Sequence, residues 1–175
     1  MADQKYDFES TVGIKIIVKK DDKYFLVKEP ESNEWMPGRM SLPGGKLLLG
    51  ESISEGLRRK IETEIGLEIE VLGLIKVMNI LMPLKNVYHF VFLAEWQSGE
   101  IDLSKIEAEN AGWYSKEEVA KFSKDDFAEY YNDQILNEVI NENYSIIPLS
   151  FVGLQDNRSE DIMSWMKSGM PDKTF

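Results

Sequence analysis

The chain has 175 residues, 43% of them apolar, and a formal net charge of -11, which together indicate a single globular domain with a packed core. An acidic surface of this kind repels the nucleic-acid backbone, so nucleic acid is not an expected partner. The absence of cysteine and the presence of one histidine exclude disulfides, thiol catalysis and any metal site that needs two imidazoles.

The first residues do not form a positively charged segment followed by an apolar one, which is the pattern of a signal peptide. No apolar run approaches the roughly 18 residues of a membrane span. These features predict a soluble, cytoplasmic protein that has no membrane partner. Residues 11–20 and 23–29 are rich in β-branched and aromatic side chains and flank Asp21-Asp22, which predicts a β-hairpin. Residues 32–50 contain two prolines and several glycines, which predicts a long loop of the kind that often carries function.

A helix is predicted from Ser52 to Ile65. Ser52 and Glu55 form the pattern of a capping box, and apolar residues recur every four positions on one face. Gly66 supplies the stop signal.

The second half of the chain is predicted to form two strands followed by helices. Residues 67–78 and 86–96 are predicted strands, and the apolar residues 79–86 between them are predicted to be a loop tip. Two further capping boxes, Ser115 with Glu118 and Asp126 with Glu129, predict two more helices. This order predicts an α/β or α+β sandwich with a mixed sheet between helices. We expect one domain over residues 1–175, with a core at about 10–143. Residues 144–175 are expected to form a C-terminal extension that packs on the core or on a partner, with a short helix at 161–167.

Residues 44–67, GGKLLLGESISEGLRRKIETEIGL, carry a recognisable spacing. The segment resembles the Nudix box, G-x5-E-x7-R-E-U-x-E-E-x-G-U, in which U is an aliphatic residue. Gly45, Glu51, Arg59, Glu64 and Gly66 fall on the matching positions without a gap. The lead-in GRMSLPGG and the later AGWYSKEEV are also similar to the family, so the resemblance covers roughly residues 10–140.

The resemblance implies the Nudix α/β/α sandwich with a mixed β-sheet. It also implies hydrolysis of a nucleoside diphosphate linked to another group, with Mg²⁺ or Mn²⁺ as cofactor. The chemistry is reasonable on physical grounds, because acids three and four residues apart on a helix share one face and can bind hard cations. Such cations neutralise a diphosphate and activate water. The glycine turn allows a backbone carbonyl to approach the same cations.

The box departs from the family pattern at two of its three clustered acids, where this chain has Lys60 and Thr63. Only Glu64 remains of the three. Because Lys60 and Glu64 are four residues apart, the lysine ammonium is expected to pair with Glu64 and to lie near the place of the family's metal. This departure leaves two functions open.

In the first, the protein is a metal-dependent hydrolase. Glu64 is then the principal catalytic residue, with Arg59 and Glu51 as a pair that orients the helix and its loop. Gly45, Glu64 and either Glu107 or Glu109, with Glu109 preferred, would hold the metal. GDP-mannose mannosyl hydrolases, a Nudix subgroup, also lack acids at the positions of Lys60 and Thr63 and cleave a sugar C–O bond. Their base is a histidine in a late loop, whereas His89 lies in a predicted strand.

In the second, the protein is a catalytically inactive nucleotide-binding or regulatory module that binds Mg²⁺ or Mn²⁺ weakly or not at all. Lys60 would then contact phosphate in place of the metal. In both alternatives the partner is a small nucleotide, and Arg39 and Gly44 join Lys60 as predicted binding residues. The apolar segment 79–86 could cap the pocket or join two copies; because Nudix proteins are frequently dimers, the resemblance favours a homodimer.

Overall fold

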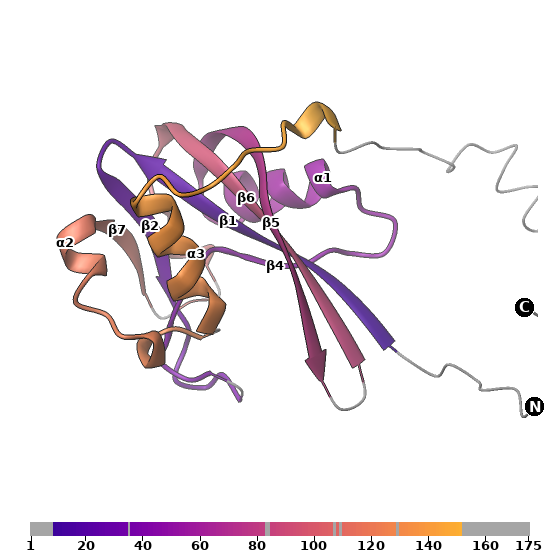
Figure 1. Cartoon of the computed structure of the whole chain (residues 1–175), viewed down its shortest axis with the longest axis horizontal. Coiled ribbons are helices and arrows are strands. Elements are labelled where there is room, and N and C mark those ends of the chain that lie inside the picture. The colour runs from indigo at the N-terminus through magenta and orange to yellow at the C-terminus, as the bar shows by residue number, and fades with distance from the viewer. Residues whose placement is uncertain are drawn as a thin grey trace, which may run out of the picture.

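The computed structural model describes residues 9–34, 36–82, 85–106, 108, 110–128 and 130–151, and Figure 1 shows its architecture. Strands β1 (Glu9–Lys20) and β2 (Lys23–Lys28) pair antiparallel, which confirms the predicted hairpin. Asp21 adopts a positive φ of 52° in the turn between them, a conformation that aspartate tolerates better than most residues do.

The proline- and glycine-rich stretch contains two short strands rather than none. β3 (Met40–Ser41) pairs with β2, and β4 (Gly44–Lys46) pairs antiparallel with residues 13–15 of β1. β1 therefore pairs with β2 only beside the turn and with β4 farther from it. This change of partner places the glycine turn against the middle of β1.

The predicted helix at 52–65 is present in two parts, α1 (Ile53–Arg58) and a π-helical turn η1 (Arg59–Thr63). The capping box is confirmed: Glu55 N donates to Ser52 Oγ at 3.2 Å, and Ser52 N donates to the Glu55 carboxylate at 2.7 Å. The predicted stop is also confirmed, since Gly66 has a φ of 88°. The π turn was not predicted, because four-residue spacing of apolar side chains does not distinguish it from an α-helix.

Strands β5 (Leu67–Met82) and β6 (Lys85–Gly99) form a long antiparallel pair that projects from the body of the molecule (Figure 1). The prediction of a loop over 79–86 is wrong for most of that segment. Ladder pairing continues from Asn79 opposite Tyr88 to Met82 opposite Lys85. Residues such as Ile80 are good strand formers, and the ladder satisfies their backbone hydrogen bonds.

The next elements along the chain are a strand and three helical segments. Their bounds are β7 (Asn110–Ser115), α2 (Lys116–Val119), the 3₁₀ turn η2 (Lys124–Asp126) and α3 (Tyr130–Ile140). The capping box of Ser115 and Glu118 is confirmed. Asp126 instead belongs to the capping box of η2, whose N-cap is Ser123, and its carboxylate accepts from Ser123 N. Glu129, its predicted partner, lies outside the described residues. The prediction placed Asp126 at the start of the helix observed as α3. In the structure Asp126 pairs with Ser123, three residues earlier, which is also the spacing of a capping box.

The sheet has the strand order β3-β2-β1-β6-β5, with β7 paired to β2 and with β1 parallel to β6. Alternate residues of its central strands enter two separate cores. Ile14, Ile16 and Phe92 pack beneath α1 and η1, whereas Ile17 and Leu93 pack beneath α2 and α3. Helical segments thus cover both faces of a mixed sheet, which confirms the predicted α/β sandwich.

After α3 the chain returns to the sheet, where Ile147 and Leu74 exchange two backbone hydrogen bonds of 2.8 Å. The turn η3 (Leu149–Phe151) follows. The described part of the predicted C-terminal extension therefore packs on the core, while the predicted helix at 161–167 lies outside the described residues. Within the described ranges, no helix is long and apolar enough to cross a membrane.

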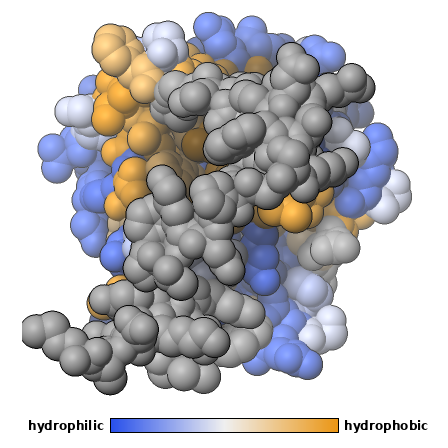
Figure 2. Space-filling view, turned by 90° about the vertical axis from the view of Figure 1, so that its right-hand side faces the viewer, coloured by the Kyte–Doolittle hydropathy of each residue, from blue (hydrophilic) through white to orange (hydrophobic). Residues whose placement is uncertain are grey.

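Some large apolar side chains remain at the surface. Figure 2 shows one face of the molecule on which hydrophobic residues reach the surface among hydrophilic ones. Leu81, at the end of the β5–β6 projection, is 75% exposed, and Leu49 of the loop before α1 is fully exposed. The homodimer expected through residues 79–86 stays a prediction.

Candidate ligand-binding site

A cleft of about 540 Å³ lies where β1 changes its partner from β2 to β4. Its volume is within the roughly 300–1,000 Å³ of typical small-ligand pockets. Among the described residues, the charged ones that line it are Lys15, Glu29, Lys46, Lys60 and Glu64. The described lining therefore carries three lysines against two glutamates, in a protein whose formal net charge is -11. Such a local excess of positive charge favours an anionic ligand.

The wall of this cleft that belongs to β4 is the glycine turn, Gly44 and Gly45. Gly44 has a φ of 152°, and a Cβ atom at this position would lie 2.1 Å from the carbonyl oxygen of Ile14. A Cβ atom on Gly45 would lie 2.7 Å from Cε of Lys60. Gly44 therefore requires glycine because the backbone of β1 cannot move aside. At Gly45 the obstacle is the end of a flexible side chain, so its φ of 158° is the stronger reason for glycine.

Arg59 connects the helix to the loop that precedes it. Its Nε and Nη2 donate to the two carboxylate oxygens of Glu51 at 2.6 and 2.7 Å, and Nη2 also donates to the Lys46 carbonyl at 3.2 Å. Glu51 accepts a further hydrogen bond of 2.9 Å from Leu48 N, and its side chain is only 10% exposed. The predicted orienting pair is present and bidentate, the strongest arrangement for arginine and a carboxylate.

The hydrogen bonds from Arg59 lower the pKa of Glu51 from 4.5 to about 2. Because the folded-state pKa is depressed, this carboxylate stabilises the protein fully above pH 4.5, and its contribution is lost as the pH falls toward 2. We expect Glu51→Gln to flatten the acid side of the stability profile and to cost about 2 kcal/mol near pH 7. Urea unfolding at a series of pH values measures this.

The control for the pH experiment is Glu62→Gln, because Glu62 is an exposed glutamate on the same helical segment. This variant should retain the steep wild-type profile between pH 4.5 and 2. Parallel profiles for the wild type and Glu51→Gln would show that the pair with Arg59 does not govern acid stability.

Glu64 lies between two cations. Nη1 of Arg59 donates to its Oε1 at 2.8 Å, and Nζ of Lys60 donates to its Oε2 at 2.7 Å. The π turn brings Glu64 to Arg59, five residues earlier. Within it Glu64 N donates to the Arg59 carbonyl at 3.0 Å, the i to i+5 bond of a π-helix. In a regular α-helix, residues five apart would be separated by roughly 140° around the axis and could not meet so readily.

Lys15 and Lys46 reach the cleft from β1 and β4, and the sequence did not identify either of them. Lys15 is only 7% exposed; its Nζ donates to Ser41 Oγ at 2.9 Å and to the Leu42 carbonyl at 3.4 Å. The sequence did contain a signal for Lys15, because this lysine interrupts the apolar run around Ile14 and Ile16 in a predicted strand. A buried ammonium on a central strand is costly and is often found at functional sites.

Mg²⁺ or Mn²⁺ is the cofactor that the resemblance to the Nudix box implies for this cleft. These ions require several oxygen ligands in near-octahedral geometry. Of the predicted ligands, Gly45 and Glu64 line the same cleft, while Glu109 and its alternative Glu107 lie outside the described residues. Across the described ranges there is no group of three or more acidic or histidine side chains that could hold a metal ion. With Glu64 shared by Arg59 and Lys60, the described donors do not fit a divalent cation.

Two further residues considered in the sequence lie apart from the cleft lining. Arg39 donates from Nη1 to the Phe127 carbonyl at 3.4 Å, so it links the loop before β3 to the segment before α3. Nδ1 of His89 is hydrogen-bonded to the hydroxyl of Tyr131. Neither residue is among those that line the cleft, whereas Gly44 and Lys60 are.

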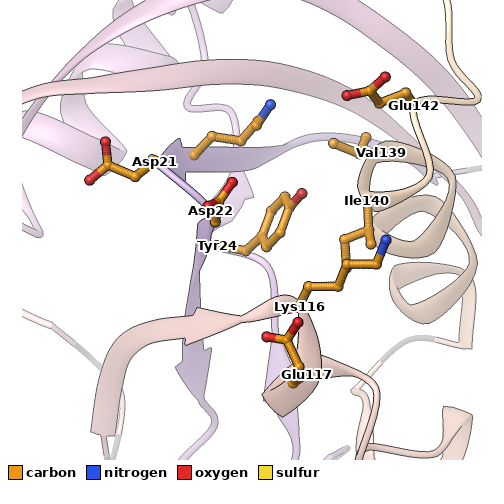
Figure 3. A pocket seen from close by; sticks show the side chains of 9 residues that line it. Asp21, Asp22, Tyr24, Lys116, Glu117, Val139, Ile140 and Glu142 are labelled. Atoms are coloured by element: carbon orange, nitrogen blue, oxygen red, sulfur yellow. The ribbon is translucent and has the colours of Figure 1, made fainter.

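A second cavity, of about 320 Å³, lies beside the β1–β2 turn (Figure 3). Asp21 and Asp22 of the turn, Lys116 of α2 and Glu142 after α3 line it together with Tyr24. Burial, with the neighbouring Tyr144, Asp22 and Glu142, raises the pKa of Tyr24. None of its lining residues comes from the segment 44–67, so the cleft at the glycine turn is the better candidate for the site.

The family model of the NUDIX domain matches residues 8–134. The chain is 31% identical over 100 residues to the NAD-capped RNA hydrolase NudC of Pseudomonas aeruginosa, covering 57% of this chain and 34% of NudC. It is 33% identical over 92 residues to the ADP-ribose pyrophosphatase of Methanocaldococcus jannaschii, covering 51% of this chain and 53% of that protein. The chain therefore spans about half or less of these relatives.

Among solved structures, a NUDIX hydrolase from Nitrosomonas europaea superimposes with a TM-score of 0.69. The superposition covers 84% of this chain and 98% of the other at 20% identity, which shows a shared fold. The match of the NUDIX domain over residues 8–134 extends across most of the chain, from β1 into α3. The chain belongs to the Nudix family.

Proposed function

We propose that this Nudix protein binds a nucleoside diphosphate-linked small molecule in the cleft at the glycine turn. The observation that carries the proposal is the convergence of Lys15, Lys46 and Lys60 on one cleft of an otherwise acidic protein. The relatives support the class of ligand, because NAD and ADP-ribose, which their names include, both contain a diphosphate joined to two larger groups. Lysine ammonium groups suit the phosphate oxygens of such a molecule.

The three lysines reach the cleft from three different elements. Lys15 lies on β1, Lys46 on β4 and Lys60 on η1. A cleft with low-dielectric walls concentrates the field of such charges and strengthens the attraction for an anion. The ion pairs of Glu64 with Arg59 and Lys60 also reduce the repulsion between its carboxylate and phosphate.

Calorimetric titration with ADP-ribose, NAD and nucleoside diphosphate sugars tests this function. We expect at least one of these probes to bind, and Lys15→Met and Lys46→Ala each to weaken binding about tenfold, as loss of a charged hydrogen bond does. Lys121→Ala, at an exposed site after α2, is the control and should bind as the wild type does. Failure of every probe to bind, or equal affinities for all variants, would contradict the proposal.

Hydrolysis of the same ligand is a second candidate function. Glu64 lines the cleft together with Gly45, and Arg59 and Glu51 hold the helix against the loop. Both relatives named above are hydrolases by name. Assays of nucleoside diphosphate sugars, dinucleotides and nucleoside triphosphates, each with and without Mg²⁺ or Mn²⁺, should then release products, and Glu64→Gln should abolish the activity. Released phosphate and released sugar distinguish P–O from C–O cleavage.

A further inference from the structure

The Lys60 ammonium occupies the centre of the cleft wall formed by the glycine turn and the helix. Its Nζ donates to Glu64 Oε2 at 2.7 Å, and its side chain is only 19% exposed. A Cβ atom on Gly45 would lie 3.0 Å from Nζ and 2.7 Å from Cε, so the lysine uses the space left by the missing side chain. The Lys60 ammonium is thus paired with Glu64 and lies beside Gly45, so this place already holds a cation that is part of the chain.

The rest of the local charge also disfavours a divalent ion at this place. The other carboxylate oxygen of Glu64 accepts from Arg59 at 2.8 Å, and Glu51 is held by two hydrogen bonds from the same guanidinium. A metal ion at Glu64 would have to displace Lys60 and would then lie close to both cations. Like charges at such distances repel strongly in a partly buried site.

We propose that Lys60 replaces a divalent metal ion in this cleft and neutralises the bound diphosphate with its own ammonium group. The replacement of the metal can be tested on the protein alone. The neutralisation of a diphosphate rests on the function proposed above.

The first experiment titrates the 175-residue protein with Mn²⁺ alone and follows binding by electron paramagnetic resonance. We expect millimolar or weaker binding to the wild type, and a new site at least tenfold tighter in Lys60→Glu. Glutamate at this position would place a second carboxylate four residues from Glu64 on the same side of the helix. The added site should disappear in the double variant Lys60→Glu with Glu64→Gln.

Lys60→Met is the matched control, because it removes the same ammonium group without adding a carboxylate to the cleft. It should bind Mn²⁺ as weakly as the wild type does. The proposal that Lys60 replaces the metal would be overturned if the wild type bound Mn²⁺ tightly and Glu64→Gln removed that binding. It would also be overturned if Lys60→Glu, shown to be folded by circular dichroism, gained no Mn²⁺ binding.

The second experiment measures ADP-ribose binding by calorimetry in EDTA and in excess Mg²⁺. We expect the wild type to bind equally well in both, and Lys60→Met, which keeps the length of the side chain and removes its charge, to bind at least tenfold more weakly in EDTA. Wild-type binding that requires Mg²⁺ would overturn the inference. Wild-type protein that binds ADP-ribose in neither condition would count against the proposed function, and the Mn²⁺ titration would still decide whether Lys60 replaces the metal.

Discussion

Gly44→Ala should lower the free energy of unfolding by about 3 to 5 kcal/mol, since it combines backbone strain with overpacking. The φ of Gly44 is 152°, and the added Cβ would lie 2.1 Å from the carbonyl oxygen of Ile14. Ile14 belongs to a rigid central strand whose backbone pairs with Gly45, so the obstacle cannot move aside as the end of a side chain can. Urea unfolding followed by circular dichroism measures the loss.

Gly50→Ala separates the two causes. Gly50 also has a positive φ, of 76°, but no atom lies within 4 Å of the position that its Cβ would occupy. This substitution should therefore cost only about 1 kcal/mol, the price of the backbone conformation. If Gly44→Ala and Gly50→Ala destabilise the protein equally, the close approach of the glycine turn to β1 has no energetic importance.

Arg59→Ala should destabilise the protein by about 3 kcal/mol, because a partly buried ion pair loses one partner and leaves the other unpaired. Arg59 donates four hydrogen bonds that join Glu51, Glu64 and the Lys46 carbonyl. Without it, the Glu51 carboxylate, whose side chain is 10% exposed, keeps only the hydrogen bond from Leu48 N. The pKa of Glu51 should then rise toward its ordinary value, which a pH series of unfolding experiments would detect.

Arg58→Ala is the control for this experiment. Arg58 is the neighbouring arginine, but it is exposed in the last turn of α1. Its removal should change the free energy of unfolding by no more than about 0.5 kcal/mol, as is usual for a surface substitution. A loss as large as that of Arg59→Ala would mean that helix propensity or charge, rather than the pair with Glu51, explains the effect.

Local patterns in the sequence determined much of the architecture. The hairpin at Asp21, the capping boxes of Ser52 and Ser115 and the stop at Gly66 are all present, because each depends on residues within a few positions of one another. The spacing from Gly45 to Gly66 was likewise sufficient to predict the pairing of Arg59 with Glu51 across the start of the helix. Short-range interactions of this kind are encoded by neighbouring residues and can be read from them.

The charge of the cleft was decided by the tertiary structure. Lys15, Lys46 and Lys60 are distant in the sequence. They meet only because β1 pairs with β2 near the turn and with β4 farther along, and because η1 packs beside the glycine turn. The position of Glu64 between Arg59 and Lys60 likewise depends on a π turn that the apolar spacing does not reveal. The sequence alone thus determined most of the elements, the family box and the presence of Lys60 in place of an acid. Which other charges share the cleft with that lysine depends on long-range contacts, because charges interact through space rather than along the chain.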